Sequence, residues 1–362
     1  MDWDITGSTA GISKVWDRPH VRARRSLAVT CIVLGVALLT FTGCDSESLF
    51  GGASSETEKA LSIFDASAVV VAHLDVESGI ESLEDLMSDG RASEDDLSAM
   101  MEQVSSYLGL NPRKDIHHVY VSLSGLDSTA VGSLIAFADF NQEAMISRLD
   151  SISELTRIDT AGKSDSYRLS ESDDLQFSLV DGSMILVSNN SEQLARLVSR
   201  ANGPESSSIN DVLLRQLEKR ESWMVVRNVN LFLPAMDSME VGNQFAQILP
   251  AIQAIQSVGI GVNTTGRELE GVLLVQPTAE VTAKDLANVF SGIRAAARIG
   301  LADFPKVLEH MEAIDISTVK GLVEISLDID EAQLKDLMKT MGSQMAGIAG
   351  MAHDRLQKED AK

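Results

Sequence analysis

Short apolar runs rich in β-branched residues alternate with amphipathic stretches along most of the chain. One run covers residues 67–75, and a run of the same character covers residues 222–230. Each is followed by a stretch whose apolar residues have the spacing of one helix face. The pattern therefore predicts a strand and then a helix in both halves of the chain. The apolar helix positions are Leu97, Met100, Met101, Val104 and Leu108 in the first half, and Phe245, Ile248, Ile252 and Ile255 in the second.

The remaining elements also recur, about 140 residues apart, which is the signature of an internal duplication. Both halves continue with a strand pair, an amphipathic helix, a hairpin and a closing helix. The hairpins turn at Asp181-Gly182 and at Lys320-Gly321, and residues of this kind favour tight two-residue turns. The strand pairs are 119–121 with 132–136 and 260–262 with 271–275; the helices carry Met145, Leu149 and Ile152, and Leu286, Phe290 and Ile293; the closing helices share Gln193-Leu194-x-x-Leu197 and Gln333-Leu334-x-x-Leu337.

This order predicts an α+β fold of two tandem, related β-α-β-β-α-β-β-α modules. Hairpin connections favour antiparallel sheets, either separate or shared, with the helices on one face. A short helix is expected from Asp211 to Lys219 between the modules. The predicted divisions are a signal or anchor at 1–44, a flexible acidic tether at 45–62, a first module at 63–203, a linker at 204–221 and a second module at 222–357. The layout loosely resembles uncharacterised bacterial envelope proteins with repeated β/α units.

The N-terminal region has the pattern of an export signal. A basic cluster of Arg22, Arg24 and Arg25 precedes an apolar run at 27–39, which is the order of a secretory signal. Arg24-Arg25-Ser26-Leu27 also has some likeness to a twin-arginine signal. Residues 26–43 could instead remain as a transmembrane anchor, because about 17 apolar residues suffice to span a bilayer. All of these alternatives place the folded part outside the cytoplasm, at a membrane.

The end of the apolar run, Phe41-Thr42-Gly43-Cys44, resembles the lipobox of bacterial lipoproteins, although Phe41 stands where Leu is usual. The resemblance implies that Cys44 receives a lipid and becomes the N-terminus after cleavage. Asp45, directly after it, resembles the inner-membrane retention signal of enteric lipoproteins. Cys31 lies inside the signal, so the mature chain would contain neither disulfides nor a cysteine-based metal site.

Composition limits the partners. Residues 1–43 carry five basic and three acidic side chains, so their removal leaves 50 acidic against 25 basic residues, a net charge of about −25. Such a charge disfavours nucleic acid, whose phosphates require basic side chains. Trp223 would be the only tryptophan of the mature chain, which also disfavours aromatic stacking on single-stranded nucleic acid.

One pair of polar positions suggests a binding pocket. His73 and Asp75 share a strand face, and the duplication maps them onto Asn228 and Asn230. The two pairs could meet across a pseudo-two-fold axis and form a small polar pocket. The alternative is that strands simply become polar where they leave the core.

Other motifs are weak. His117 and His118 are expected on opposite faces of a strand, so that they cannot chelate one metal ion together. Gly162-Lys163-Ser164 lacks the upstream glycine of a phosphate-binding loop, and the Ser317–Lys320 spacing lies in a predicted hairpin instead of a helix. A Met-rich segment with a small-residue stripe is expected to pack on the body of the protein: Met338, Met341, Met345, Gly342, Ala346 and Gly350.

The sequence thus predicts no catalytic residue, metal site or cofactor. The favoured hypothesis is a membrane-anchored lipoprotein of the bacterial cell envelope with a non-enzymatic binding or scaffolding role. One alternative is a carrier that holds a lipid or other hydrophobic ligand between sheet and helices. Another is an envelope enzyme with an unrecognised site.

Overall fold

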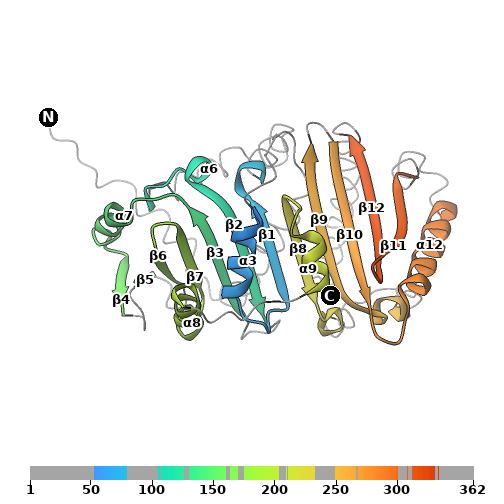
Figure 1. Cartoon of the computed structure of the whole chain (residues 1–362), viewed down its shortest axis with the longest axis horizontal. Helices are drawn as coiled ribbons and strands as arrows, with labels where there is room; N and C mark the ends of the chain where they lie inside the picture. The colour runs from blue at the N-terminus through green and yellow to red at the C-terminus, as the bar shows by residue number, and fades with distance from the viewer. Residues whose placement is uncertain are drawn as a thin grey trace, which may run out of the picture.

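A computed structural model gives the fold (Figure 1). It describes residues 53–79, 105–106, 108–125, 130–159, 164–169, 175–203, 209, 211–232, 249–265, 268–300, 308, 312–330 and 333. Within these residues, twelve strands form one antiparallel sheet in the order β11-β12-β10-β9-β8-β1-β2-β3-β7-β6-β5-β4. The strands are β1 Val70–Asp75, β2 Ile116–Ser124, β3 Val131–Ala138, β4 Leu155–Ile158, β5 Asp165–Leu169, β6 Gln176–Val180, β7 Met184–Ser188, β8 Ser222–Arg227, β9 Ile255–Thr265, β10 Glu268–Pro277, β11 Ile314–Val319 and β12 Leu322–Asp330.

The two halves of the chain have the same strand order. β1-β2-β3-β7-β6 in the first half corresponds to β8-β9-β10-β12-β11 in the second. The first strands of the halves lie side by side in antiparallel register, with Val71 opposite Val225 and His73 opposite Trp223. The predicted α+β fold with antiparallel pairing is confirmed, and the two modules share a single sheet.

The first half contains a hairpin that the periodicity does not predict. Helix α7 (Gln142–Leu149) is short, and β4 and β5 follow it before β6. In the second half, helix α12 (Ala283–Gly300) is much longer. The residues that form a longer helix in the second module form a short helix and two strands in the first. The spacing of the flanking elements therefore stays the same.

The helices cover both faces of the sheet, so the prediction that they lie on one face is wrong. Helices α3 (Ala53–Ile63), α8 (Ser191–Asn202) and α9 (Val212–Leu217) pack on the face that carries Tyr120, Leu186 and Val225, called here the α3 face. Helix α7 packs on the opposite face, over Ala136 and Ile185. Helix α12 lies on that same opposite face, over Val275 and Val323. Neighbouring residues such as Ile185 and Leu186 point to opposite sides of a strand, and both are buried, so both faces need cover.

Two predicted connecting segments belong partly to the core. Ala60, Ile63 and Phe64 of α3 and its end are buried in the main cluster under the α3 face. The predicted tether therefore cannot extend to residue 62. Leu213 and Leu217 of α9 are buried in the same cluster, so the expected helix exists but is part of the core and not a free linker. Both segments contain many polar residues, and the few apolar residues between them form the buried face of a helix.

Turns and boundaries agree with local chemistry in most places. Asp181, Gly182, Lys320 and Gly321 all have positive φ, from 49° to 82°, as the two predicted hairpin turns require. Ile255 begins β9 and is not part of a helix, because its neighbours follow the two-residue alternation of a strand.

Cys44, the apolar run at 26–43, the Met-rich segment and Gly162 and Lys163 lie outside the described residues. In the described part of the chain, none of the helices has the length and apolar character needed to cross a bilayer.

Candidate functional site

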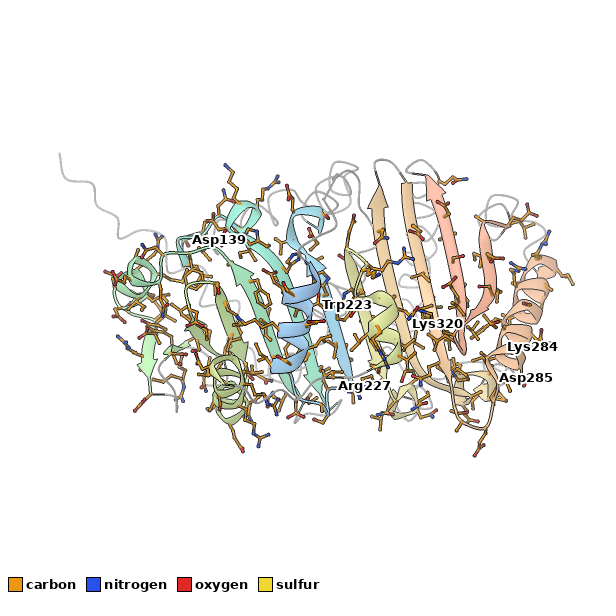
Figure 2. All side chains as sticks on the ribbon, viewed as in Figure 1. Asp139, Trp223, Arg227, Lys284, Asp285 and Lys320 are labelled. Atoms are coloured by element: carbon orange, nitrogen blue, oxygen red, sulfur yellow. The ribbon has the colours of Figure 1, made fainter. Side chains whose placement is uncertain are left out.

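A cluster of polar and aromatic side chains lies beneath the N-terminal half of α3. The antiparallel register of β1 and β2 places His73 opposite Tyr120 and Asp75 opposite His118, all on the α3 face. On its other side, β1 places His73 opposite Trp223 of β8. The cluster therefore sits where the two modules meet, with Trp223 at the middle of the sheet beside α3 (Figure 2).

His73 is buried, with 3% of its surface exposed. Its ring stacks on Tyr120 with 4.6 Å between centroids, and its Nε2 lies 3.2 Å from Nδ1 of His118. Burial lowers the pKa of His73 well below its usual value, and the nearby His118 lowers it further. The imidazole is therefore neutral at physiological pH. Its Nδ1 is buried and has no hydrogen-bond partner among the described residues.

His118 connects the buried histidine to two carboxylates. Its Nε2 lies 3.6 Å from Oε2 of Glu56 on α3, and its Nδ1 lies 3.6 Å from Oδ2 of Asp75. Thr57 of α3 forms a 2.9 Å hydrogen bond with the hydroxyl of Tyr120, whose pKa is raised by burial. The polar contacts thus fix the start of α3 to the two strands below it.

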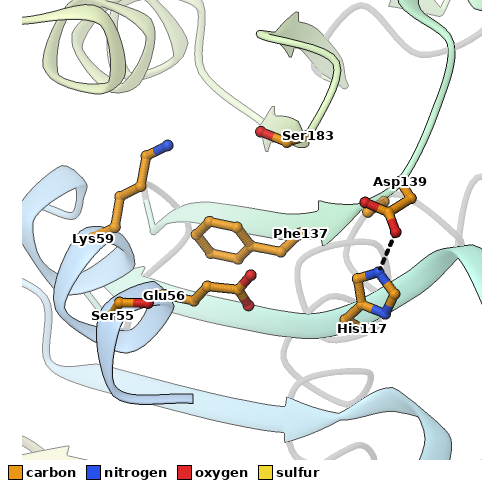
Figure 3. Close-up of a pocket in the computed structure, with 8 residues that line it drawn as sticks. Ser55, Glu56, Lys59, His117, Phe137, Asp139 and Ser183 are labelled. Carbon is orange, nitrogen blue, oxygen red and sulfur yellow. Dashed lines mark ion pairs between the residues drawn. The ribbon is translucent and has the colours of Figure 1, made fainter. Parts of the chain in front are cut away.

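A cavity of about 250 Å³ opens beside this cluster (Figure 3). Glu56 and Lys59 of α3 line one side, and His117 and Asp139 form an ion pair of 3.1 Å at the other. Oε2 of Glu56 is buried and has no hydrogen-bond partner among the described residues. The remaining lining residues are Ser55, Phe137, Ala138 and Ser183.

His117 and His118 do not follow simple strand alternation. The register between β2 and β3 pairs Ile116 with Ala138 and His118 with Phe137, which leaves His117 as the extra residue of a β-bulge. His118 contacts Glu56, and His117 lines the cavity that Glu56 also lines. The prediction that the two histidines point to opposite faces is therefore wrong, because the bulge interrupts the alternation.

The predicted pocket of His73, Asp75, Asn228 and Asn230 is not formed. Because β1 and β8 are antiparallel, the end of β1 lies beside the start of β8, and the amide of Asp75 bonds the carbonyl oxygen of Glu221. Asn228 follows the far end of β8, about seven residues of strand away, or roughly 23 Å. In Figure 2, Asp139 lies near the upper end of the sheet and Arg227, next to Asn228, near the lower end. A pseudo-two-fold axis between antiparallel neighbours places the equivalent ends of the two strands at opposite ends of the seam between them.

Asn228 lines a different cavity of about 220 Å³, near the start of α9. Asn228 has a positive φ of 55°, and Arg227 beside it lies 3.4 Å from Asp211. Arg227 also donates to the carbonyl oxygens of Ala66 and Ala68 in the other module. This polar region therefore joins the modules at the opposite end of their shared seam.

Sequence reasoning missed four members of the cluster: Glu56, Thr57, Tyr120 and Trp223. Glu56 and Thr57 fall in the predicted tether, and the two aromatic residues have the pattern of ordinary core positions. The period-two spacing of His118 and Tyr120 is a signal that could have found Tyr120, whereas nothing local indicates the other three. Within the described residues, no three His, Cys, Asp or Glu side chains are arranged to hold a metal ion together.

No family model matches the chain, and no curated protein sequence is similar to it. Solved structures similar to this chain include crystal forms I, III and IV of the protein TP0453. Form I has a TM-score of 0.43 at 10% identity and covers 77% of this chain and 96% of its own. Forms III and IV have TM-scores of 0.41 at 11% identity; they cover 77% and 76% of this chain, and 97% and 95% of their own.

Proposed function

We propose that the chain is a lipid-anchored protein of the bacterial cell envelope, with a non-enzymatic binding or scaffolding role. The observation that carries the proposal is the position of Cys44 at the end of the predicted export signal, shortly before a helix that belongs to the core. Helix α3 begins at Ala53, so residues 45–52 connect the lipid site to the folded body. Eight residues span at most about 29 Å when fully extended, which keeps the body next to the bilayer.

The contacts of the polar cluster support a structural role for it. His73 and Tyr120 are buried, stack on each other and lie under α3. The Tyr120 hydroxyl bonds Thr57, and Nε2 of His73 bonds His118 of the same chain. A general acid or base must instead reach a proton on the substrate. The cluster accordingly fixes the segment that follows the anchor to the centre of the sheet.

Cys44→Ser tests the anchor in a bacterial host that lipidates exported proteins. The unaltered chain is expected to yield an N-terminal peptide that begins at Cys44 and carries the mass of its acyl chains, and to sediment with membranes. The variant should lack that mass and retain residues 1–43. Full-length, unlipidated product from the unaltered chain would refute the lipid anchor and indicate a transmembrane one.

A further inference from the structure

Among the described residues, strand β11 ends the sheet and its outer side pairs with no strand. It pairs with β12 in regular register from Val319 opposite Leu322 to Ile314 opposite Leu327. In a two-residue hairpin the residues next to the turn bond each other, and the bonded pairs alternate after them. The backbone groups of Ile314, Ile316 and Thr318 therefore point outward. Arg294 of α12 donates to the carbonyl oxygen of Ile314, which agrees with this direction.

The equivalent side of the other module is occupied by a strand. β6 holds the place of β11 in the first half, and β5 pairs with its outer side, with Ser166 opposite Ser178 and Tyr167 opposite Phe177. The architecture of the module therefore accepts an antiparallel strand at this position. In the second half, no strand among the described residues lies there.

The two ends of the sheet differ in how they are protected. At the far end, β4 has only four residues, and its Arg157 forms ion pairs with Asp150 and Asp165. Short length and charge are common ways to discourage pairing at an edge. β11 has six residues, Ile-Asp-Ile-Ser-Thr-Val, without Pro, Lys, Arg or a bulge. Thr318 lies on the α12 side of the strand and is exposed, so α12 leaves this part of the edge uncovered.

Charge indicates which segment would fit. On the α3 face, Asp315 and Asp328 are exposed and Glu324 is half-buried, and none of them has an ion-pair partner within the described residues. A basic side chain beside Asp315 would be attracted to this group of carboxylates. A second copy of the chain would place identical carboxylates beside these. Each copy also has a net charge of −23, so the repulsion opposes self-pairing.

We propose that the outer side of β11 binds an extended segment of a partner polypeptide, in which apolar residues alternate with Lys or Arg. The segment adds as an antiparallel strand, as β5 does on β6, and bonds Ile316 and Thr318. Its apolar residues lie on the side of Ile316 and α12, and its basic residues lie beside Asp315. This deepens the proposed binding role by naming its surface and the chemistry of its partner.

The test uses the purified full chain in detergent and a labelled eight-residue peptide of alternating Val and Lys. Binding is measured by fluorescence anisotropy, and residue-resolved hydrogen exchange reports the site. The amides of Ile316 and Thr318 should exchange more slowly with peptide, while those of Asp315 and Ser317, already bonded to β12, should not change. A peptide that is N-methylated at alternate residues keeps its charge but loses the hydrogen bonds, and should bind at least tenfold more weakly.

Two variants separate strand addition from adhesion of charge. Thr318→Pro removes an outward amide and leaves the β12 pairing intact, so it should fold, as checked by circular dichroism, and should weaken binding at least tenfold. Asp315→Lys should reverse the preference toward a Val-Glu peptide. Equal binding of the N-methylated peptide, or unchanged exchange at Ile316 and Thr318, would overturn the proposal. Protection of these amides by self-association alone would also overturn it, in favour of a second copy.

These outcomes are independent of the Cys44 experiment. A chain that lacks a lipid would still bind the peptide if β11 is the site. A chain that carries a lipid but leaves β11 unprotected would keep its anchor and lose this binding surface.

Discussion

At the scale of single residues, His73 is an imidazole held neutral inside the core. It lies between Tyr120 and Trp223, with ring centroids 4.6 and 5.7 Å away, and within the described residues its ring has one hydrogen-bond partner, His118. A charged imidazole here would lose its hydration without gaining a carboxylate of its own, so burial lowers the pKa of His73. The unfolded chain has no such penalty and takes up the proton near pH 6.5.

This difference makes stability depend on pH in a defined direction. The contribution of neutral His73 is fully present above pH 6.5 and is lost as the pH falls below it, because only the unfolded state then binds the proton. The free energy of unfolding should fall by up to about 1.4 kcal/mol per pH unit from this residue. Urea unfolding between pH 8 and 5 measures it. His73→Phe should flatten the slope, and an unchanged slope in this variant would contradict the assignment.

At the scale of elements, α9 approaches β9 closely because two strand positions lack side chains. A Cβ at Gly259 would lie 2.6 Å from Cδ1 of Leu217, and one at Gly261 would lie 2.7 Å from its Cδ2. Leu217 is fully buried and has little room to move. These glycines weaken a strand in isolation, so their presence here reflects the packing of the helix above them.

Gly259→Ala should therefore destabilise the protein by about 1–3 kcal/mol, since the added methyl also meets Leu213 and Val225 at 3.5 Å. The matched control is Gly292→Ala in α12, where a Cβ would meet nothing within 4 Å. That change should stabilise the helix by about 1 kcal/mol. In thermal and urea unfolding, the free energy of unfolding should therefore fall for Gly259→Ala and rise for Gly292→Ala. A stabilising Gly259→Ala would show that α9 can move away from the sheet.

At the scale of the whole molecule, the two modules share one core. The cluster on the α3 face runs from Leu186 and Leu197 in the first half to Trp223 and Leu322 in the second. The seam between β1 and β8 lies at the middle of this cluster, and α3 and α9 cover it from one side. Neither module can separate without exposing Val71 and Val225, which are both fully buried.

Unfolding should accordingly be one transition, although the two halves have the same strand order. Trp223 at the seam reports the junction when Trp3 and Trp16 are replaced by Phe, and circular dichroism reports both modules. The two signals should change at the same urea concentration. Two separated transitions would indicate modules that fold independently and only touch at β1 and β8.

The sequence by itself determined the elements whose information is local. The apolar runs of β2 and β10, the turns at Asp181-Gly182 and Lys320-Gly321 and the helical spacing around Leu194 all follow from neighbours a few residues apart. The antiparallel α+β fold with repeated strand order follows from them. The role of Cys44 also rests on local sequence and stays a prediction.

Only the tertiary structure decided the relations between distant segments. The antiparallel pairing of β1 with β8 separates His73 from Asn228 along the seam. The sequence of either strand alone does not determine this pairing. Glu56 and Thr57 contact His118 and Tyr120, some sixty residues later, only because α3 packs over that part of the sheet. In the first module, β5 pairs with the outer side of β6. In the second, no described strand pairs with the outer side of β11, the strand that corresponds to β6. Side-chain partners at long range depend on packing, and a periodicity reports the face of an element without naming what covers it.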